Sequence, residues 1–353
     1  MNQMSMLTYE LSSLFGGTVL SSGAMIAIGG TVAICTCINL LWRCRRRRRR
    51  GRALLKGEPV CEVQRLRMLE AQFYMRSSLD YTLEEPLPSI GSRRGRAFCK
   101  VRELVERRRC CCPARGHLRL MSISPCREVP GLHNERVRSA LRDLLLGTRH
   151  SFLARVHQAD VLAAARLVVV VRDWYPSGSL RDRMHSTRPA KPFATKYSQV
   201  GMALSERAVA RFGGQLLHAL IALRPFGEWA ILHVHCGNLF VGSNGQLQLS
   251  EWESALLGAP SYLEHAIDAL RPLMEPAVAA LCFALYEMAC GYESDMPRPS
   301  DYPPHCPPRI VEHLEELFRP GAPGSPATLE DVAAMTLFGQ DHMRVVGELH
   351  QPL

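Results

Sequence analysis

The 24-residue run Val19–Trp42 contains no charged side chain and ends directly against a cluster of arginines, which restricts the fold of the chain more than any other feature. As a helix, this run would be about 36 Å long, enough to cross a hydrocarbon core of about 30 Å. No basic residue precedes it, and it is longer than the apolar core of a cleaved signal peptide. It also lacks the polar face that helices of globular domains usually have. Residues 19–42 are therefore predicted to form a transmembrane helix.

The charges around this run predict its orientation. Residues 1–52 contain eight arginines and one acidic residue, Glu10, and all eight arginines follow the run. Because positively charged flanks stay in the cytoplasm, we expect a short extracytoplasmic N-terminus (1–18), a polyarginine stop-transfer segment (43–52) and a single-pass membrane protein with a cytoplasmic C-terminal domain. The expected flank, with anionic lipid contact at Arg43–Arg52, comprises Trp42, Arg43, Arg45, Arg46, Arg47, Arg48, Arg49, Arg50 and Arg52.

The basic character of the chain is local. The formal net charge is +10, and residues 1–52 supply +7 of it, so a nucleic-acid-binding surface is not indicated. The thirteen cysteines include no C-x-x-C pair, which argues against a zinc ribbon or a redox motif and favours reduced thiols. Cys37 and Cys44 lie at the depth of the membrane interface and are palmitoylation candidates.

The rest of the chain is predicted to contain a juxtamembrane helix or linker (53–87), a folded domain (88–338) and a C-terminal tail (339–353). Apolar residues at Val63, Leu66, Leu69 and Phe73 recur at helical spacing. The domain begins with strands and ends with helices, which is typical of a two-lobed α+β fold. The expected strands cover 96–101, 118–123, 167–171, 239–241 and 246–249, and the expected helices cover 134–146, 205–223, 277–289, 308–318 and 328–337.

Four segments in order carry a family resemblance: VVVVRDWYPSGSLRDRM, LHVHCGNLFV, LSEWESALLG and CFALYEMACGYE. Together they resemble the slowpoke-binding protein and PX-domain-containing kinase-like group of protein-kinase relatives. The similarity is good over residues 166–293 and weakens on both sides. It implies a two-lobed protein-kinase-like domain, whose catalytic positions can be examined one at a time.

By this resemblance, the catalytic centre is degenerate. His233 stands where kinases have the catalytic aspartate, and His235 stands where they have the catalytic-loop lysine. Asn238 is kept at a metal position. Glu251 replaces the metal-binding aspartate of the D-F-G triplet, and Glu253 replaces its glycine. Trp252, between them, is expected to fill the pocket that a nucleotide would use.

The nucleotide-binding positions are degenerate as well. Gly91 and Gly95 are vestiges of the glycine-rich loop, with arginines between them that hinder close approach to phosphate. Residues 117–124, where the strand lysine belongs, contain no lysine, and Arg119 is the nearest cation. The glutamate expected near Leu141 is absent, with Asp143 close by. The aspartate that anchors the catalytic loop is replaced by Ala277.

The resemblance therefore implies a pseudokinase, with no enzyme activity and no cofactor. If Mg²⁺-ATP binds, Gly91, Gly95, Asn238 and Glu251 would hold it. A metal site at His233, His235 and Cys236 is disfavoured because no further ligand is near in sequence. The preferred function is a membrane-anchored scaffold for protein partners, by family resemblance an ion channel or its adaptor. The alternatives are a weak or atypical kinase using His233 and Glu251, and a purely structural tether.

Overall fold

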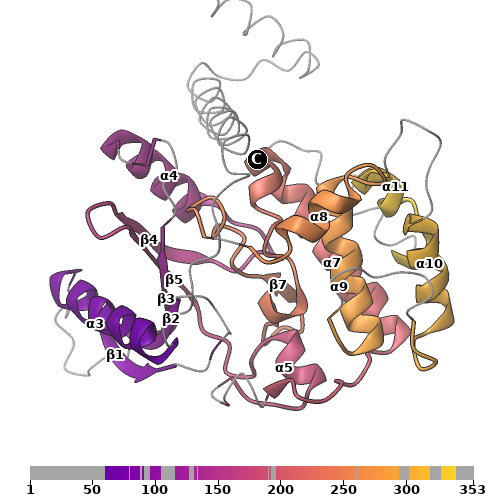
Figure 1. Cartoon of the computed structure of the whole chain (residues 1–353), viewed down its shortest axis with the longest axis horizontal. Coiled ribbons are helices and arrows are strands. Elements are labelled where there is room, and N and C mark those ends of the chain that lie inside the picture. Colours follow the sequence, from indigo (N-terminus) through magenta and orange to yellow (C-terminus); the bar gives the residue numbers. More distant parts are fainter. Residues whose placement is uncertain are drawn as a thin grey trace, which may run out of the picture.

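The computed structural model describes residues 60–78, 80–87, 90, 96–104, 116–126, 131–132, 134–189, 191, 196–259, 261–293, 302–318 and 327–338, with side chains from Leu66 onward. Two lobes lie side by side, one built on a sheet and one on helices (Figure 1). The predicted α+β class is confirmed by this arrangement.

The first lobe is a five-stranded antiparallel sheet with the order β1-β2-β3-β5-β4. Strand β5 lies between β3 and β4, and its valine run is buried on both faces, as expected for a continuous β-branched segment. The segment expected as a juxtamembrane helix or linker contributes β1, so the sheet begins before residue 88. The strands are β1 (Tyr81–Pro86), β2 (Ala97–Glu103), β3 (Leu118–Pro125), β4 (Val156–Leu162) and β5 (Leu167–Asp173).

Two helices cover this sheet. Helix α4 (Glu135–Gly147) packs against β4 and is capped by Asn134, whose side chain accepts a hydrogen bond from the backbone N–H of Arg136. Helix α3 (Val60–Ser78) lies against β1, β2 and β3. It buries Ala71, Tyr74 and Met75 in the sheet.

The outer face of α3 is apolar too. Leu66, Leu69 and Phe73 are 53%, 46% and 70% exposed, so the periodic residues that predict this helix point to solvent instead of the sheet. The spacing of its apolar residues therefore predicted the helix but not the face that packs against the sheet, which depends on tertiary contacts.

The second lobe is built around α9 (Pro276–Cys290), an apolar helix buried from Val278 to Cys290. It packs against α7 (Glu206–Leu223) at Gly213, where an added Cβ would lie only 2.6 Å from a Leu285 methyl. The lobe also contains α5 (Leu180–Met184), η1 (Arg224–Trp229), η2 (Cys236–Asn238), β6 (Leu239–Val241), β7 (Leu247–Leu249), α8 (Glu264–Leu270), α10 (Pro308–Phe318), α11 (Leu329–Ala333) and η4 (Thr336–Phe338).

Local signals in this lobe are confirmed. Ser205 caps α7 by accepting a hydrogen bond from the N–H of Ala208. Thr328 and Asp331 form the expected capping box of α11. Gly245 has a φ of 74° in the turn between β6 and β7, as the Asn-Gly dipeptide predicts.

The predicted membrane localisation requires a correction. Within the described ranges, no helix combines the length and the apolar character that crossing a membrane requires. The most apolar long helix, α9, has 15 residues and would be about 22 Å long, shorter than a hydrocarbon core of about 30 Å. This finding overturns the expectation of a single-pass membrane protein. The expected transmembrane segment 19–42, Trp42 with the arginines after it, Cys37, Cys44 and the tail 339–353 lie outside the described residues.

Candidate functional site

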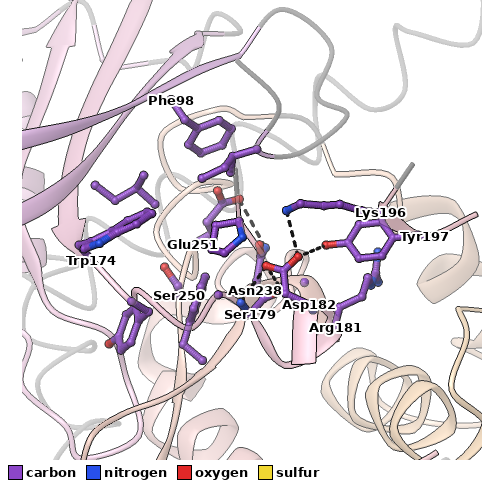
Figure 2. A pocket seen from close by; sticks show the side chains of 17 residues that line it. Phe98, Trp174, Ser179, Arg181, Asp182, Lys196, Tyr197, Asn238, Ser250 and Glu251 are labelled. Atoms are coloured by element: carbon purple, nitrogen blue, oxygen red, sulfur yellow. Dashed lines mark hydrogen bonds and ion pairs between the residues drawn. The ribbon is translucent and has the colours of Figure 1, made fainter. Parts of the chain in front are cut away.

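A small cavity lies between the two lobes, where a kinase would hold its nucleotide (Figure 2). The sheet contributes Phe98 of β2 and Leu120 of β3, and Trp174 follows β5 directly. Asn238 of η2 and Glu251, two residues after β7, form the opposite wall. The cavity volume is about 70 Å³, and the remaining lining residues are Ile90, Tyr175, Gly178, Ser179, Arg181, Asp182, Pro189, Lys196, Tyr197, Gly237, Phe240 and Ser250.

The two metal-position residues do come together at this cavity. The side-chain amide of Asn238 donates to the carbonyl oxygen of His233 at 2.9 Å and to Oε2 of Glu251 at 3.4 Å. The same carboxylate oxygen accepts a hydrogen bond from Nη1 of Arg96 at 2.8 Å, and Arg96 is itself buried. Glu251 has a φ of 61°, a left-handed conformation that is strained for this residue type. The guanidinium of Arg96 therefore supplies the positive charge beside Glu251, where a kinase would bind a metal ion.

The two histidines of the degenerate catalytic loop make different contacts. His233 Nδ1 is 3.9 Å from Oε2 of Glu251. His235 caps η2 through Nδ1, which accepts from the N–H of Gly237 at 3.1 Å, and its ring packs on Tyr262. The thiol of Cys236 donates to the carbonyl oxygen of Ala284 at 3.6 Å, so these three side chains do not converge on one point.

A second buried arginine crosses the space between the lobes. Arg172, the sixth residue of β5, forms an ion pair with Glu253. Its Nη1 donates to Oγ of Ser122 on β3 at 2.7 Å, and its Nη2 donates to Oγ of Ser254 at 3.3 Å. Sequence reasoning missed both arginines. Two sequence features could have identified them. Arg172 is a charged residue directly after the buried run LVVVV, and Arg96 is a charged residue at the start of a predicted strand.

Strand β3 carries serines where the lysine is missing. Ser122 and Ser124 are buried and bind the two arginines, Ser124 through Nε of Arg96 at 3.0 Å. Arg119, the nearest cation expected from sequence, is bound instead by Asp173 at 2.7 Å and by Glu103 at 3.4 Å. The positive charge that pairs with Glu251 and Glu253 therefore comes from Arg96, directly before β2, and from Arg172 of β5.

The catalytic loop is anchored by a residue that the sequence did not single out. Glu287, in the last turns of α9, accepts a hydrogen bond from the N–H of Cys236 at 3.0 Å and one from Nη2 of Arg181 at 2.9 Å. Ala277, where the loop-anchoring aspartate was expected, lies at the other end of the same helix. The sequence feature that could have identified Glu287 is that it is the one carboxylate in an otherwise apolar helix. Burial lowers the pKa of the Arg181 guanidinium, but the Glu287 and Glu293 carboxylates raise it by more.

The remaining charges at the cavity are paired. Asp182 accepts from Nζ of Lys196 at 2.9 Å and from the hydroxyl of Tyr197 at 2.8 Å. Its other oxygen closes the capping box of α5 with Ser179. Burial, together with the charge of Asp182, raises the pKa of the Tyr197 hydroxyl. Lys196 is therefore neutralised within the cavity wall (Figure 2).

One expectation about the site needs correction, the place of the missing helix glutamate can now be described, and the glycine-rich loop lies outside the described residues. Trp252 does not fill the cavity: its ring packs edge-on against Phe226 and its Nε1 donates to the carbonyl oxygen of Ala154. On α4, Leu141 is buried and Asp143 is exposed, so the helix presents apolar side chains to the sheet. Gly91 and Gly95 fall outside the described residues.

A five-stranded antiparallel sheet joined to a helical lobe, with a cleft between them, defines a protein-kinase-like domain, and here the metal position is occupied by protein charges. The chain is 30% identical over 287 residues, 79% of its length, to the probable inactive serine/threonine-protein kinase slob2 of Dictyostelium discoideum. It is 28% identical over 317 residues, 83% of its length, to the slowpoke-binding protein of Drosophila melanogaster. It is also 28% identical over 184 residues, 50% of its length, to the PX domain-containing protein kinase-like protein of Mus musculus.

The chain spans only part of these relatives: 48%, 59% and 30% of their respective lengths. No protein-family model matches it. The chain is a relative of the slowpoke-binding and PX-domain-containing kinase-like proteins, so the resemblance predicted from its sequence is confirmed. The name of the slob2 relative, a probable inactive kinase, supports the prediction of a pseudokinase.

Proposed function

We propose that this chain is a catalytically inactive kinase-like scaffold that binds protein partners and no nucleotide. The observation that carries the proposal is the cavity between the lobes, about 70 Å³ in volume. Sites for small molecules usually have volumes of about 300–1,000 Å³. A nucleotide would therefore require the lobes to separate and buried side chains to leave their partners.

The charges of the site support the same conclusion. A kinase holds Mg²⁺ with carboxylate and amide oxygens that face the phosphates. Here the Glu251 carboxylate is bound by Arg96, and the side-chain amide of Asn238 donates to Glu251 and to the backbone. A divalent cation at this point would lie beside a buried guanidinium, which repels it.

The kind of partner is proposed from the relatives. One of them is named as a protein that binds slowpoke. By that relationship, we propose a protein partner for this chain as well, in the class of ion channels or their adaptors. Nucleic acid is not proposed as a partner.

The alternative, a weak kinase using His233 and Glu251, gains no support from the geometry. His233 Nδ1 lies 3.9 Å from the carboxylate of Glu251, which Arg96 already binds. Several charge-stabilising groups are replaced together, and losing even one such group typically lowers rates by about 10²–10³.

Nucleotide binding is tested by thermal unfolding of the full chain with ATP and Mg²⁺. We expect no shift of the melting temperature. A ligand at 100 times its Kd would stabilise the fold by about 2.7 kcal/mol, which is easily measured. A Mg²⁺-dependent shift that disappears in Asn238→Ala would refute the proposal and favour the atypical kinase.

Partner binding is tested by comparing variants in one co-precipitation from a membrane lysate, with bound proteins identified by mass spectrometry. His233→Ala should leave recovery of the same partner unchanged. Leu285→Asp should abolish it, because Leu285 is 1% exposed and packs on α7 at Gly213. Loss of the partner in the first variant, with its circular dichroism unchanged, would contradict the scaffold role.

A further inference from the structure

Four charged residues bridge the two lobes, and one of them, Glu251, lines the small cavity. Arg96 and Arg172 come from the sheet lobe, whereas Glu251 and Glu253 come from the segment after β7 in the helical lobe. We propose that these residues form an inter-lobe latch, which holds the kinase-like domain closed without nucleotide or metal. The latch goes beyond the proposed function, because it concerns how the lobes are held and not what they bind.

The first arm of the latch is the Arg172–Glu253 pair. The two side chains are 2% and 0% exposed, so the pair is shielded from water and salt. The residues are 81 positions apart in the chain and belong to different lobes. Any opening of the cleft at this point separates the two charges.

The second arm is the Arg96–Glu251 pair, at 2.8 Å. It is coupled to the first arm through Ser254, whose Oγ accepts from Nη2 of Arg96 at 3.4 Å and from Nη2 of Arg172 at 3.3 Å. Each guanidinium thus binds a serine of its own lobe and a glutamate of the other lobe. The fixing partners on β3 are Ser122 for Arg172 and Ser124 for Arg96.

This arrangement determines the response to mutation. When one partner of a buried pair is removed, the remaining charge is left without compensation and is stabilised by contact with water. The nearest route to water for Glu253 is separation of the lobes at the latch. Loss of Arg172 should therefore raise the population of an open state before it unfolds the domain.

The test is hydrogen–deuterium exchange on the full-length chain with Arg172→Met and, separately, Glu253→Gln. The glutamine keeps the shape of the side chain and removes its charge, so it decides the outcome if the methionine variant does not fold. We expect exchange to rise by about tenfold or more at both sides of the cleft, in peptides covering 118–125 and 250–254. Peptides from α9 should stay protected.

Arg102→Met is the matched control, because Arg102 also lies in a strand of the sheet and pairs with a carboxylate, Glu84, but at the surface. It should leave exchange at both segments unchanged. The double variant Arg172→Met/Glu253→Gln should not exceed the larger single effect, since both changes break one interaction. Unchanged exchange at 250–254 in a folded single variant, or a uniform rise that includes α9, would overturn the latch.

Discussion

Replacing Glu287 with alanine should destabilise the chain more than any surface substitution, because this carboxylate anchors the catalytic loop from within the core. It is 2% exposed and is bonded to both Nε and Nη2 of Arg181 and to the N–H of Cys236. Breaking a buried ion pair costs about 3–5 kcal/mol, and an unsatisfied buried N–H adds about 1–3 kcal/mol. Glu293 still binds Arg181 at 2.9 Å and offsets part of this loss.

We therefore expect Glu287→Ala to lower the free energy of unfolding by about 3 kcal/mol or more. For a domain of this size, that corresponds to a fall in melting temperature of about 6–12 °C. Urea unfolding of the full chain at pH 7, followed by circular dichroism, measures the free energy directly. The same variant should raise hydrogen exchange in the loop around Cys236, which loses its anchor.

Two further variants separate this explanation from a general effect of truncation. Glu330→Ala removes the partner of Arg224 from an exposed pair and should cost less than about 1 kcal/mol. The double variant Arg181→Met/Glu287→Leu should be more stable than Glu287→Ala, because no buried charge is left unpaired. The reasoning fails if Glu287→Ala costs no more than the surface variant, or if the double variant is the less stable of the two.

Three other predictions concern the fold around the site. Leu285→Ala should lower the free energy of unfolding by about 2–5 kcal/mol in urea titrations, because the leucine is 1% exposed and its truncation leaves a cavity beside Gly213 of α7. A cost below about 1 kcal/mol would contradict this expectation. Ser205→Ala should cost about 1 kcal/mol through loss of the α7 cap, whereas Ser205→Asp should retain most of the stability. Burial lowers the pKa of His150, and burial together with Arg181 lowers that of His185, so the unfolded chain binds more protons below the ordinary value of 6.5. The melting temperature should fall between pH 7.5 and pH 5.5, and His150→Gln should reduce the slope; a melting temperature that rises towards pH 5.5 would contradict this assignment.

Elements that depend on neighbours along the chain were predictable. The helix expected over 277–289 is α9 (Pro276–Cys290), and the hairpin was placed by its Asn-Gly turn. Strands β1 (Tyr81–Pro86) and β4 (Val156–Leu162) were not expected. The first contains two glutamates and ends in proline, and the second carries histidine and aspartate within the run, so neither has the composition of a typical strand. Pairing with β2 and β5 overrides that weak local preference.

The candidate site was predictable only at positions that the order of motifs in the kinase relatives assigns. The motif order predicted that Asn238 and Glu251 lie close together, and their side chains are in contact. It did not provide Arg172 or Glu287, whose partners Glu253 and Arg181 lie 81 and 106 positions away. Spacing along a chain carries no information about such pairs, because they form only when two lobes or two helices meet.

The charge pairs in the cleft explain why several catalytic residues are replaced together in this chain. Without the two buried arginines, the glutamates after β7 would be buried charges of the same sign, which folding does not tolerate. Arg96 and Arg172 balance them, and the cavity beside Glu251 has a volume of about 70 Å³. Reversing a single position would not restore a kinase site. An aspartate in place of Glu251 would still lie beside Arg96. Within 117–124, where the strand lysine belongs, a lysine in place of Ser122 would lie beside Arg172, which Ser122 now binds. Inactivity is therefore stabilised by the fold itself, because each charge in the cleft is held by another charge of the protein.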